Sequence, residues 1–386
     1  MDLSYIINQL GEDRENYFNA VAPPIIQTSN FSFSSVDGLR EGLADEFKET
    51  IYSRGKNPTL DILRKKIAAL DGAEDAIIFS SGVSAIFLAV FANVKQGDHI
   101  VSVAKPYSWT NRLFNEILPR FGITANMIDG TKVESFETAI RPNTKIIYLE
   151  SPNTFTFELQ DLEAVAKLAK SKGITTIIDN SYCSPLYQKP CELGIDISMQ
   201  TATKYLGGHS DVVAGVISGS KEMIRKIFVS DFLAVGAAIS PFNAWLLLRS
   251  LRTFEMRVER SSRSAQKIVA HFENHPKITK MIYPFSKSFP QNHLAKKQMK
   301  QPGGLFTISL KTDSVDVIEN FCNSLKRFLM AVSWGGHESL VIPTCATIKK
   351  GDYNPANIDH KLIRFYIGLE DPDLLIADIE QALEKV

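Results

Sequence analysis

Short, continuously apolar segments alternate with amphipathic segments between about residues 51 and 240, and this alternation constrains the fold more than any other feature of the sequence. The apolar segments are AIIF at 76–79, HIVSVA at 99–104, KIIYLE at 145–150, ITTIID at 174–179, DISMQTAT at 196–203 and VVAGVISG at 212–219. Strands that crossover helices cover on both faces have this apolar character, whereas half-exposed strands alternate with polar residues. The sequence therefore predicts an α/β fold with a mostly parallel sheet between layers of helices.

Capping residues mark the helices of this region and help to divide the chain. Asn57 and Pro58 start an amphipathic helix that Gly72 ends, and Asp161 and Gly173 frame another. After residue 241 comes a long helical segment, 244–272, which we expect to be a connector. Strands such as GLFTISL and helices such as PDLLIADIEQALEKV then alternate. We expect an N-terminal segment (1–50), a large domain (51–240) and a smaller C-terminal α+β domain (241–386).

Charge and cysteine content argue against several classes of protein. The 43 Lys and Arg balance 43 Asp and Glu, so nothing favours binding to nucleic acid or to an anionic membrane surface. The uncharged stretch 76–94 is interrupted by Ser80, Ser81 and Gly82, which predicts strand, turn and helix rather than a membrane span. Four scattered cysteines and the lack of a secretory signal favour a cytoplasmic protein without disulfides or a bound metal.

Candidate chemistry lies where the predicted strands end, because open α/β sheets bind ligands there. Gly82 and Val83 open a helix after AIIF and could hold a phosphate, although any tight turn favours small residues. Asp179 closes ITTIID, where it could cap a helix or pair with a cation. Lys204 follows an apolar strand, and a buried lysine becomes a nucleophilic amine suited to a Schiff base. Carboxylate, lysine, hydroxyls and helix N-terminus together match the needs of pyridoxal 5'-phosphate.

Six motifs in order give the chain a resemblance to a known family. They are APPIIQTSNFSF (22–33), IYSRGKNPTL (51–60), TATKYLGGHSD (201–211), AISPFNAWLLLRSLRT (238–253), SWGGHESL (333–340) and LIRFYIGLEDPDLLIADIEQAL (362–383). The chain resembles the Cys/Met-metabolism family of pyridoxal-phosphate-dependent enzymes, which includes cystathionine γ-synthase, the cystathionine lyases and methionine γ-lyase. The resemblance implies the type I, aspartate-aminotransferase-like fold.

The resemblance also implies roles for individual residues. Lys204 matches the Schiff-base lysine, Asp179 the partner of the pyridinium nitrogen, and Tyr107 the tyrosine that stacks on the cofactor and shuttles protons. The residues matching phosphate contacts are Gly82, Val83, Thr201 and Thr203. Arg364 matches the arginine that binds the α-carboxylate of an amino-acid substrate, and Ser333 lies beside that carboxylate in the family. Tyr52 and Arg54 match residues that reach the phosphate of a neighbouring subunit, which implies at least a homodimer, and a homotetramer in the family pattern.

Departures from the family pattern bear on the reaction. Trp109 stands where methionine γ-lyases carry cysteine, and Thr154 and Phe155 stand where the family usually has Asn-Pro. SWGGHESL, with Trp334, and SPNTFTFELQDL resemble the bacterial cystathionine β-lyases more closely. We therefore expect β-elimination of cystathionine or cysteine-like thioethers to a thiol, pyruvate and ammonia. The alternatives are γ-replacement or γ-elimination on O-acyl homoserine, cystathionine or methionine, an aminotransferase, and a regulator without turnover.

Overall fold

The computed structural model describes residues 1–386, and the chain divides into two compact units. The first unit comprises 1–151, 160–207 and 211–253, and the second comprises 152–159, 208–210 and 254–386. The first unit thus includes the N-terminal segment and continues beyond the expected boundary at residue 240. None of its helices, nor any in the second unit, is both long and apolar enough to cross a membrane.

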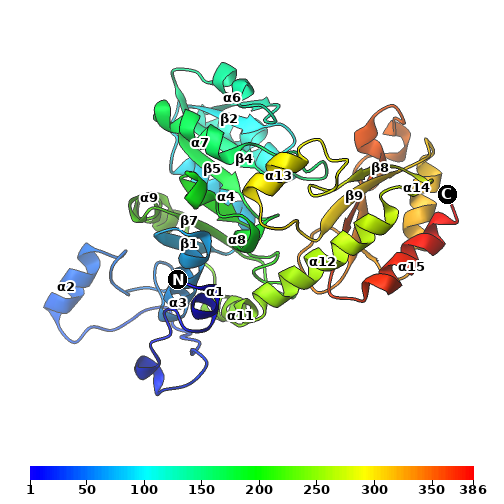
Figure 1. Cartoon of the computed structure of the whole chain (residues 1–386). Coiled ribbons are helices and arrows are strands. Elements are labelled where there is room, and N and C mark those ends of the chain that lie inside the picture. Colours follow the sequence, from blue (N-terminus) through cyan, green and yellow to red (C-terminus); the bar gives the residue numbers. More distant parts are fainter. The chain divides into compact units, whose positions relative to one another are not determined.

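The first unit is built on a seven-stranded sheet with the order β1-β7-β6-β5-β4-β2-β3 (Figure 1). Its strands are β1 (Asp75–Phe79), β2 (His99–Val103), β3 (Thr124–Ile128), β4 (Thr144–Glu150), β5 (Thr175–Asp179), β6 (Ile197–Gln200) and β7 (Gly215–Gly219). Only β7 runs against the others, and it pairs antiparallel with both β1 and β6. The predicted sheet is therefore confirmed as mostly parallel.

Helices cover both faces of this sheet. The α-helices of the first unit are α1 (Leu3–Asn8), α2 (Val36–Ala44), α3 (Pro58–Asp71), α4 (Gly82–Phe91), α5 (Ser108–Arg112), α6 (Val133–Ala139), α7 (Leu162–Ser171), α8 (Ser184–Tyr187), α9 (Lys221–Ile227), α10 (Leu233–Val235) and α11 (Pro241–Leu251). Successive residues of one strand enter different cores: Ile146 packs in a cluster with α4, and Ile147 packs in a cluster with α7. The apolar runs in the sequence arise because both faces of each strand are buried.

The predicted helix signals are confirmed at α3 and α7. The Asn57 side chain accepts from Thr59 N at the start of α3, and Gly72 ends that helix with a φ of 68°. Asp161 caps α7 in the same way. The long helix expected over 244–272 is wrong in one respect, since it is two helices, α11 and α12 (Phe254–Phe272). The main chain tightens between them through hydrogen bonds that span three residues, from Arg252 N and Thr253 N.

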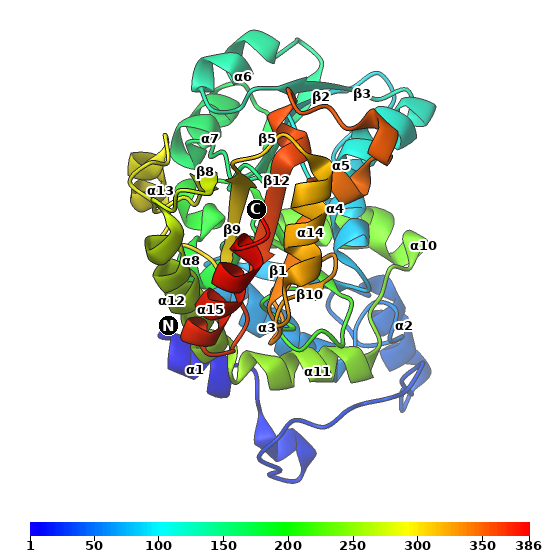
Figure 2. The same cartoon turned by 90° about the vertical axis from the view of Figure 1, so that its right-hand side faces the viewer.

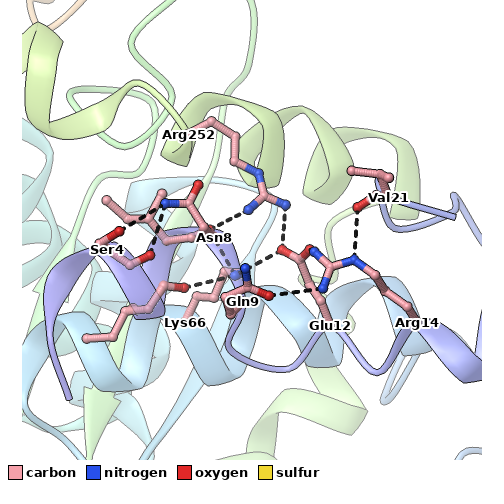
Figure 3. A network of polar contacts seen from close by, with 10 residues as sticks. Ser4, Asn8, Gln9, Glu12, Arg14, Val21, Lys66 and Arg252 are labelled. Atoms are coloured by element: carbon pink, nitrogen blue, oxygen red, sulfur yellow. Dashed lines mark hydrogen bonds and ion pairs between the residues drawn. The ribbon is translucent and has the colours of Figure 1, made fainter. Parts of the chain in front are cut away.

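A buried ionic network fastens α1 to the rest of the first unit (Figure 3). The Glu12 carboxylate is fully buried and accepts Lys66 Nζ at 3.0 Å, and it also pairs with Arg252 and Arg14. Lys66 Nζ donates further to two carbonyl oxygens of α1, at 2.8 Å and 2.9 Å. Burial lowers the pKa of Lys66, whereas its bond to Glu12 acts in the opposite direction. Separating these groups would leave charges buried without a partner, which is costly. The network therefore holds the N-terminal segment in place against α3 and α11.

The second unit has a five-stranded sheet with the order β10-β11-β12-β9-β8. Its strands are β8 (Ile278–Ile282), β9 (Leu305–Leu310), β10 (Leu329–Met330), β11 (Leu340–Pro343) and β12 (Leu362–Tyr366), and its other helices are α13 (Asn292–Gln298), α14 (Val315–Ser324) and α15 (Pro372–Leu383). In Figure 2, α14 and α15 lie beside β9 and β12. Ile363 and Phe365 enter the core against these helices. Strand alternation therefore directs Arg364 to the opposite face.

Candidate active site

Most of the predicted cofactor residues lie along one edge of the seven-stranded sheet. Strands β1, β2, β4, β5 and β6 run in one direction, so their carboxyl ends meet there. Gly82 and Val83 follow β1, Tyr107 follows β2, Asp179 ends β5, and the segment 201–204 follows β6. The structure therefore brings together residues that the sequence separates by more than a hundred positions.

The turn between β1 and α4 forms a close-packed cradle of main chain. Ser81 caps α4, since its Oγ accepts from Ser84 N at 3.1 Å. A Cβ at Gly82 would lie 2.3 Å from Thr201 Oγ1, and a Cβ at Gly215 would lie 2.3 Å from Ser81 O. Only glycine fits at these two positions. The N–H groups that open the ten-residue α4 are suited to an anion such as a phosphate.

Asp179 lies buried at the end of β5, with Lys204 near enough to influence its charge. Burial raises the pKa of Asp179, while hydrogen bonds from Ser181 and the positive charge of Lys204 lower it. Ser181 N donates to Asp179 Oδ1 at 2.9 Å. A carboxylate that burial destabilises gains from a cationic partner, and a protonated pyridine nitrogen is such a partner. Asp179, Lys204 and the α4 cradle thus fit pyridoxal phosphate.

The two threonines around Ala202 have different surroundings. Thr201 N donates to Ser181 Oγ at 2.7 Å, and the Thr201 side chain lies against Gly82. Thr203 Oγ1 accepts from Ala214 N at 3.0 Å and donates to Ala214 O at 3.2 Å. The Thr203 hydroxyl thus bonds to its own loop. Direct phosphate contacts from Thr201 and Thr203 stay predictions.

Glu150 holds the main chain of Tyr107 in place, a role that the sequence did not predict. Glu150 Oε2 accepts from Tyr107 N at 2.7 Å, and Glu150 is in register with Asp179 on the adjacent strand. Burial, Asp179 and Glu150 raise the pKa of Tyr107, so its phenol stays protonated at neutral pH. Trp109 lies two residues after Tyr107 and is 49% exposed, with the Arg112 guanidinium 5.4 Å from the centre of its ring. A carboxylate that ends the KIIYLE strand is the only sequence signal for Glu150.

Tyr52 and Arg54 also belong to the first unit and are exposed. The Arg54 guanidinium lies 5.4 Å from the centre of the Tyr52 ring. Tyr52 forms a bridge with Asn30, so the two N-terminal segments support each other. Contact of this pair with the phosphate of a neighbouring subunit stays a prediction.

Arg364 and Ser333 lie in the second unit. Arg364 is on β12, between Ile342 of β11 and Thr307 of β9, and its Nη2 donates to Ser333 O at 3.5 Å. Its guanidinium carbon lies 4.7 Å from the centre of the Phe155 ring. Arg364 and Ser333 are therefore neighbours in the structure, and Phe155, which the sequence did not identify as a site residue, lies beside them. Binding of a carboxylate by Arg364 stays a prediction.

Comparisons with known proteins agree with this geometry. Residues 5–384 match the family described as Cys/Met metabolism PLP-dependent enzyme. The chain is 37% identical to an L-methionine gamma-lyase of Treponema denticola, over 96% of this chain and 94% of that protein. It is 38% identical to a cystathionine gamma-lyase of Bacillus subtilis, over 95% of each. The crystal structure of metB from Corynebacterium glutamicum superposes with a TM-score of 0.92 and 32% identity, over 100% of this chain and 98% of that one. The fold class is therefore confirmed, and the chain belongs to the Cys/Met-metabolism family of pyridoxal-phosphate-dependent enzymes.

Proposed function

We propose that this enzyme catalyses γ-elimination on a sulfur amino acid such as methionine or cystathionine. The observation that carries the proposal is the similarity, along nearly the whole chain, to curated methionine and cystathionine gamma-lyases. These relatives favour the alternative of the sequence analysis over its first expectation, which was β-elimination. With methionine and water, the products would be methanethiol, 2-oxobutanoate and ammonia.

The proposed roles follow from the positions of the side chains. Pyridoxal phosphate, when bound, supplies an electron sink that allows an amino acid to lose the proton of its Cα atom. Lys204 would hold the aldehyde carbon of the cofactor and move protons from substrate Cα and Cβ. Asp179 would bind the pyridine nitrogen, and the N–H groups that open α4 would bind the phosphate. Tyr107, whose raised pKa keeps its phenol protonated, would donate a proton to the departing sulfur.

Substrate selection would rest on Arg364. A guanidinium binds a carboxylate through two parallel hydrogen bonds, which fix both its position and its plane. A fixed carboxylate helps to orient the Cα–H bond, so Arg364 would contribute to rate as well as to affinity. Tyr52 and Arg54 would act on the cofactor of a neighbouring subunit in a homodimer or homotetramer. A cytoplasmic location also stays a prediction.

β-Elimination stays the second candidate because of Trp109. This exposed indole lies two residues after Tyr107, at a position where methionine γ-lyases carry cysteine. A bulky ring there could restrict how far a substrate side chain extends from Cα, which would favour cleavage at Cβ.

Product analysis with L-cystathionine separates the two reactions. γ-Elimination gives cysteine and 2-oxobutanoate, whereas β-elimination gives homocysteine and pyruvate. We expect 2-oxobutanoate from cystathionine and from methionine, and no keto acid from the Lys204→Ala control. Pyruvate and homocysteine as the main products would refute γ-elimination, and absence of both keto acids would refute the lyase function.

A further inference from the structure

We propose that Phe155 is a positioning residue for Arg364. The aromatic ring of Phe155 holds the plane of the Arg364 guanidinium, so that the edge of the guanidinium receives the α-carboxylate of the substrate. The inference rests on the proposed function, in which Arg364 binds that carboxylate. Phe155 and Arg364 are 209 positions apart in the sequence, and they meet within the second unit.

The contact between the two side chains has the geometry of a cation–π interaction. The guanidinium carbon lies 4.7 Å from the ring centre, within the ~6 Å limit for such contacts. All N–H groups of a guanidinium point outward in its own plane. Packing of the ring against the guanidinium therefore restricts rotation of the group, and the ring does not compete for its in-plane hydrogen bonds. Arg364 Nη2 directs one of these bonds toward Ser333 O, at 3.5 Å.

The loop that carries Phe155 is built to be rigid. Asn153 Oδ1 accepts from Glu158 N and from Thr156 Oγ1, each at 3.0 Å, and Asn153 Nδ2 donates to Glu158 Oε2 at 3.0 Å. Gln291 fixes the end of the loop, since its side chain bonds both Leu159 N, at 2.8 Å, and Leu159 O, at 2.7 Å. The loop thus places the aromatic ring at a defined position.

The two residues that contact the Arg364 guanidinium, Phe155 and Ser333, both have a strained main chain. Phe155 has a φ of 64° and Ser333 a φ of 83°, although neither is glycine. Phe157, in the same loop, has a φ of 55°. Left-handed conformations of residues other than glycine are costly and persist where the surroundings enforce them, often at functional sites. Two such residues therefore meet the same guanidinium.

The expected consequence is stronger and more selective binding of carboxylates. A free arginine side chain loses much rotamer freedom when it binds a ligand, and a guanidinium held in place beforehand loses less. Removing the ring should weaken carboxylate binding on the order of fivefold to tenfold. Binding of an uncharged analogue should change little, because such an analogue does not form the two parallel hydrogen bonds between a carboxylate and the Arg364 guanidinium.

Calorimetry with two matched probes tests the proposal on the cofactor-loaded enzyme. The probes are 4-(methylthio)butanoate, which is methionine without its amino group, and the corresponding amide. We would compare wild type with Phe155→Leu, which removes the ring, and with Phe155→Tyr, which keeps it. Should the leucine variant fail to fold, Phe155→Asn is a substitute, since asparagine tolerates a positive φ.

The ratio of the two dissociation constants decides between the outcomes. We expect the preference for the acid to fall about fivefold to tenfold in Phe155→Leu and to be retained in Phe155→Tyr. The KM for methionine should rise by a similar factor while the absorption band of the cofactor stays unchanged. An unchanged ratio in Phe155→Leu, or an equal loss in Phe155→Tyr, would overturn the role of Phe155. If Arg364→Lys also leaves the ratio unchanged, the proposed carboxylate site itself is wrong.

Discussion

Asp71 offers a stability measurement whose sign and size follow from its surroundings. It is the last residue of α3 and is fully buried. Its Oδ1 accepts from Gln200 Nε2 at 2.7 Å, whereas its Oδ2 has no hydrogen-bond partner in the structure. Burial raises the pKa of Asp71 from 3.8 to about 7, and the nearby Ser218, Lys189 and Gln200 only partly oppose this.

The raised pKa predicts a loss of stability as the pH rises. In the unfolded chain Asp71 loses its proton near pH 3.8, and in the folded protein it keeps the proton up to about pH 7. The stabilising contribution of this proton is complete below pH 3.8 and is lost by the time the pH has passed 7. At about 1.36 kcal/mol per pH unit, the total loss is about 4 kcal/mol, of which about 2.5 kcal/mol falls between pH 5 and pH 8.

Asp71→Asn should remove this dependence. The amide is neutral at every pH, its oxygen can still accept from Gln200, and its nitrogen replaces the oxygen that has no partner. We expect the stability difference, variant minus wild type, to grow by about 2.5 kcal/mol from pH 5 to pH 8. Urea unfolding at fixed protein and cofactor concentrations measures this difference.

A second aspartate provides the matched control for this experiment. Asp196 Oδ2 accepts two hydrogen bonds from Thr176, each at 2.8 Å. Asp196→Asn should cost about 1 kcal/mol at both pH values, because it weakens a bonded group. A difference for Asp71→Asn that stays flat with pH would show that Asp71 is already ionised in the folded protein at pH 5, and a difference that falls would contradict the predicted sign.

Four further outcomes test the site and the N-terminal anchor. Lys204→Ala should abolish turnover, and peptide mapping after borohydride reduction of wild type should find the cofactor on Lys204; a label on another lysine would exclude the assignment. Mixed oligomers of Lys204→Ala and Arg54→Ala should recover part of the activity, and no recovery after verified subunit exchange would count against a shared site. Arg364→Lys should lower kcat/KM by about 10²-fold, or about 3 kcal/mol, and near-normal kinetics would make Arg364 structural. Glu12→Ala should destabilise the protein by about 3–5 kcal/mol in urea unfolding, because it leaves Lys66 buried without its carboxylate, and a loss below 1 kcal/mol would show that water replaces the partner.

The large sheet could be predicted from the sequence because its cause is local. Neighbouring residues such as Ile177 and Ile178 enter cores on opposite faces, so each strand must be apolar throughout. The order of the strands has no such local signal. The antiparallel pairing of β1 with β7 joins residues about 140 positions apart, as with Phe79 and Gly215. It depends on the close approach of Gly215 to Ser81, which a single sequence does not reveal.

The residues that support the site were harder to predict than those proposed to perform the chemistry. Asp179 ends β5 and Lys204 lies in the segment that follows β6, and a charged residue is conspicuous at either place. Glu150 also ends a strand, but its partner is the main chain of Tyr107, and a backbone N–H is the same in every sequence. In the sequence, Phe155 cannot be told apart from an ordinary core phenylalanine. Its positive φ and its contact with Arg364 exist only in three dimensions.

The motifs shared with the family bear little on the choice between β- and γ-elimination, because they are constrained by packing. In TATKYLGGHSD, a Cβ at Gly208 would lie 1.6 Å from Arg257 Nη1, so any larger residue would displace a buried guanidinium. In SWGGHESL, a Cβ at Gly336 would lie 2.2 Å from Ser210 Oγ. Such glycines are required by the fold whichever bond is cleaved, so likeness in these motifs says little about the reaction. A residue free of such constraints is a better guide, and Trp109, with 49% of its surface exposed, is one. The products formed by Trp109→Cys, compared with those of wild type, therefore bear more directly on the reaction than any glycine motif.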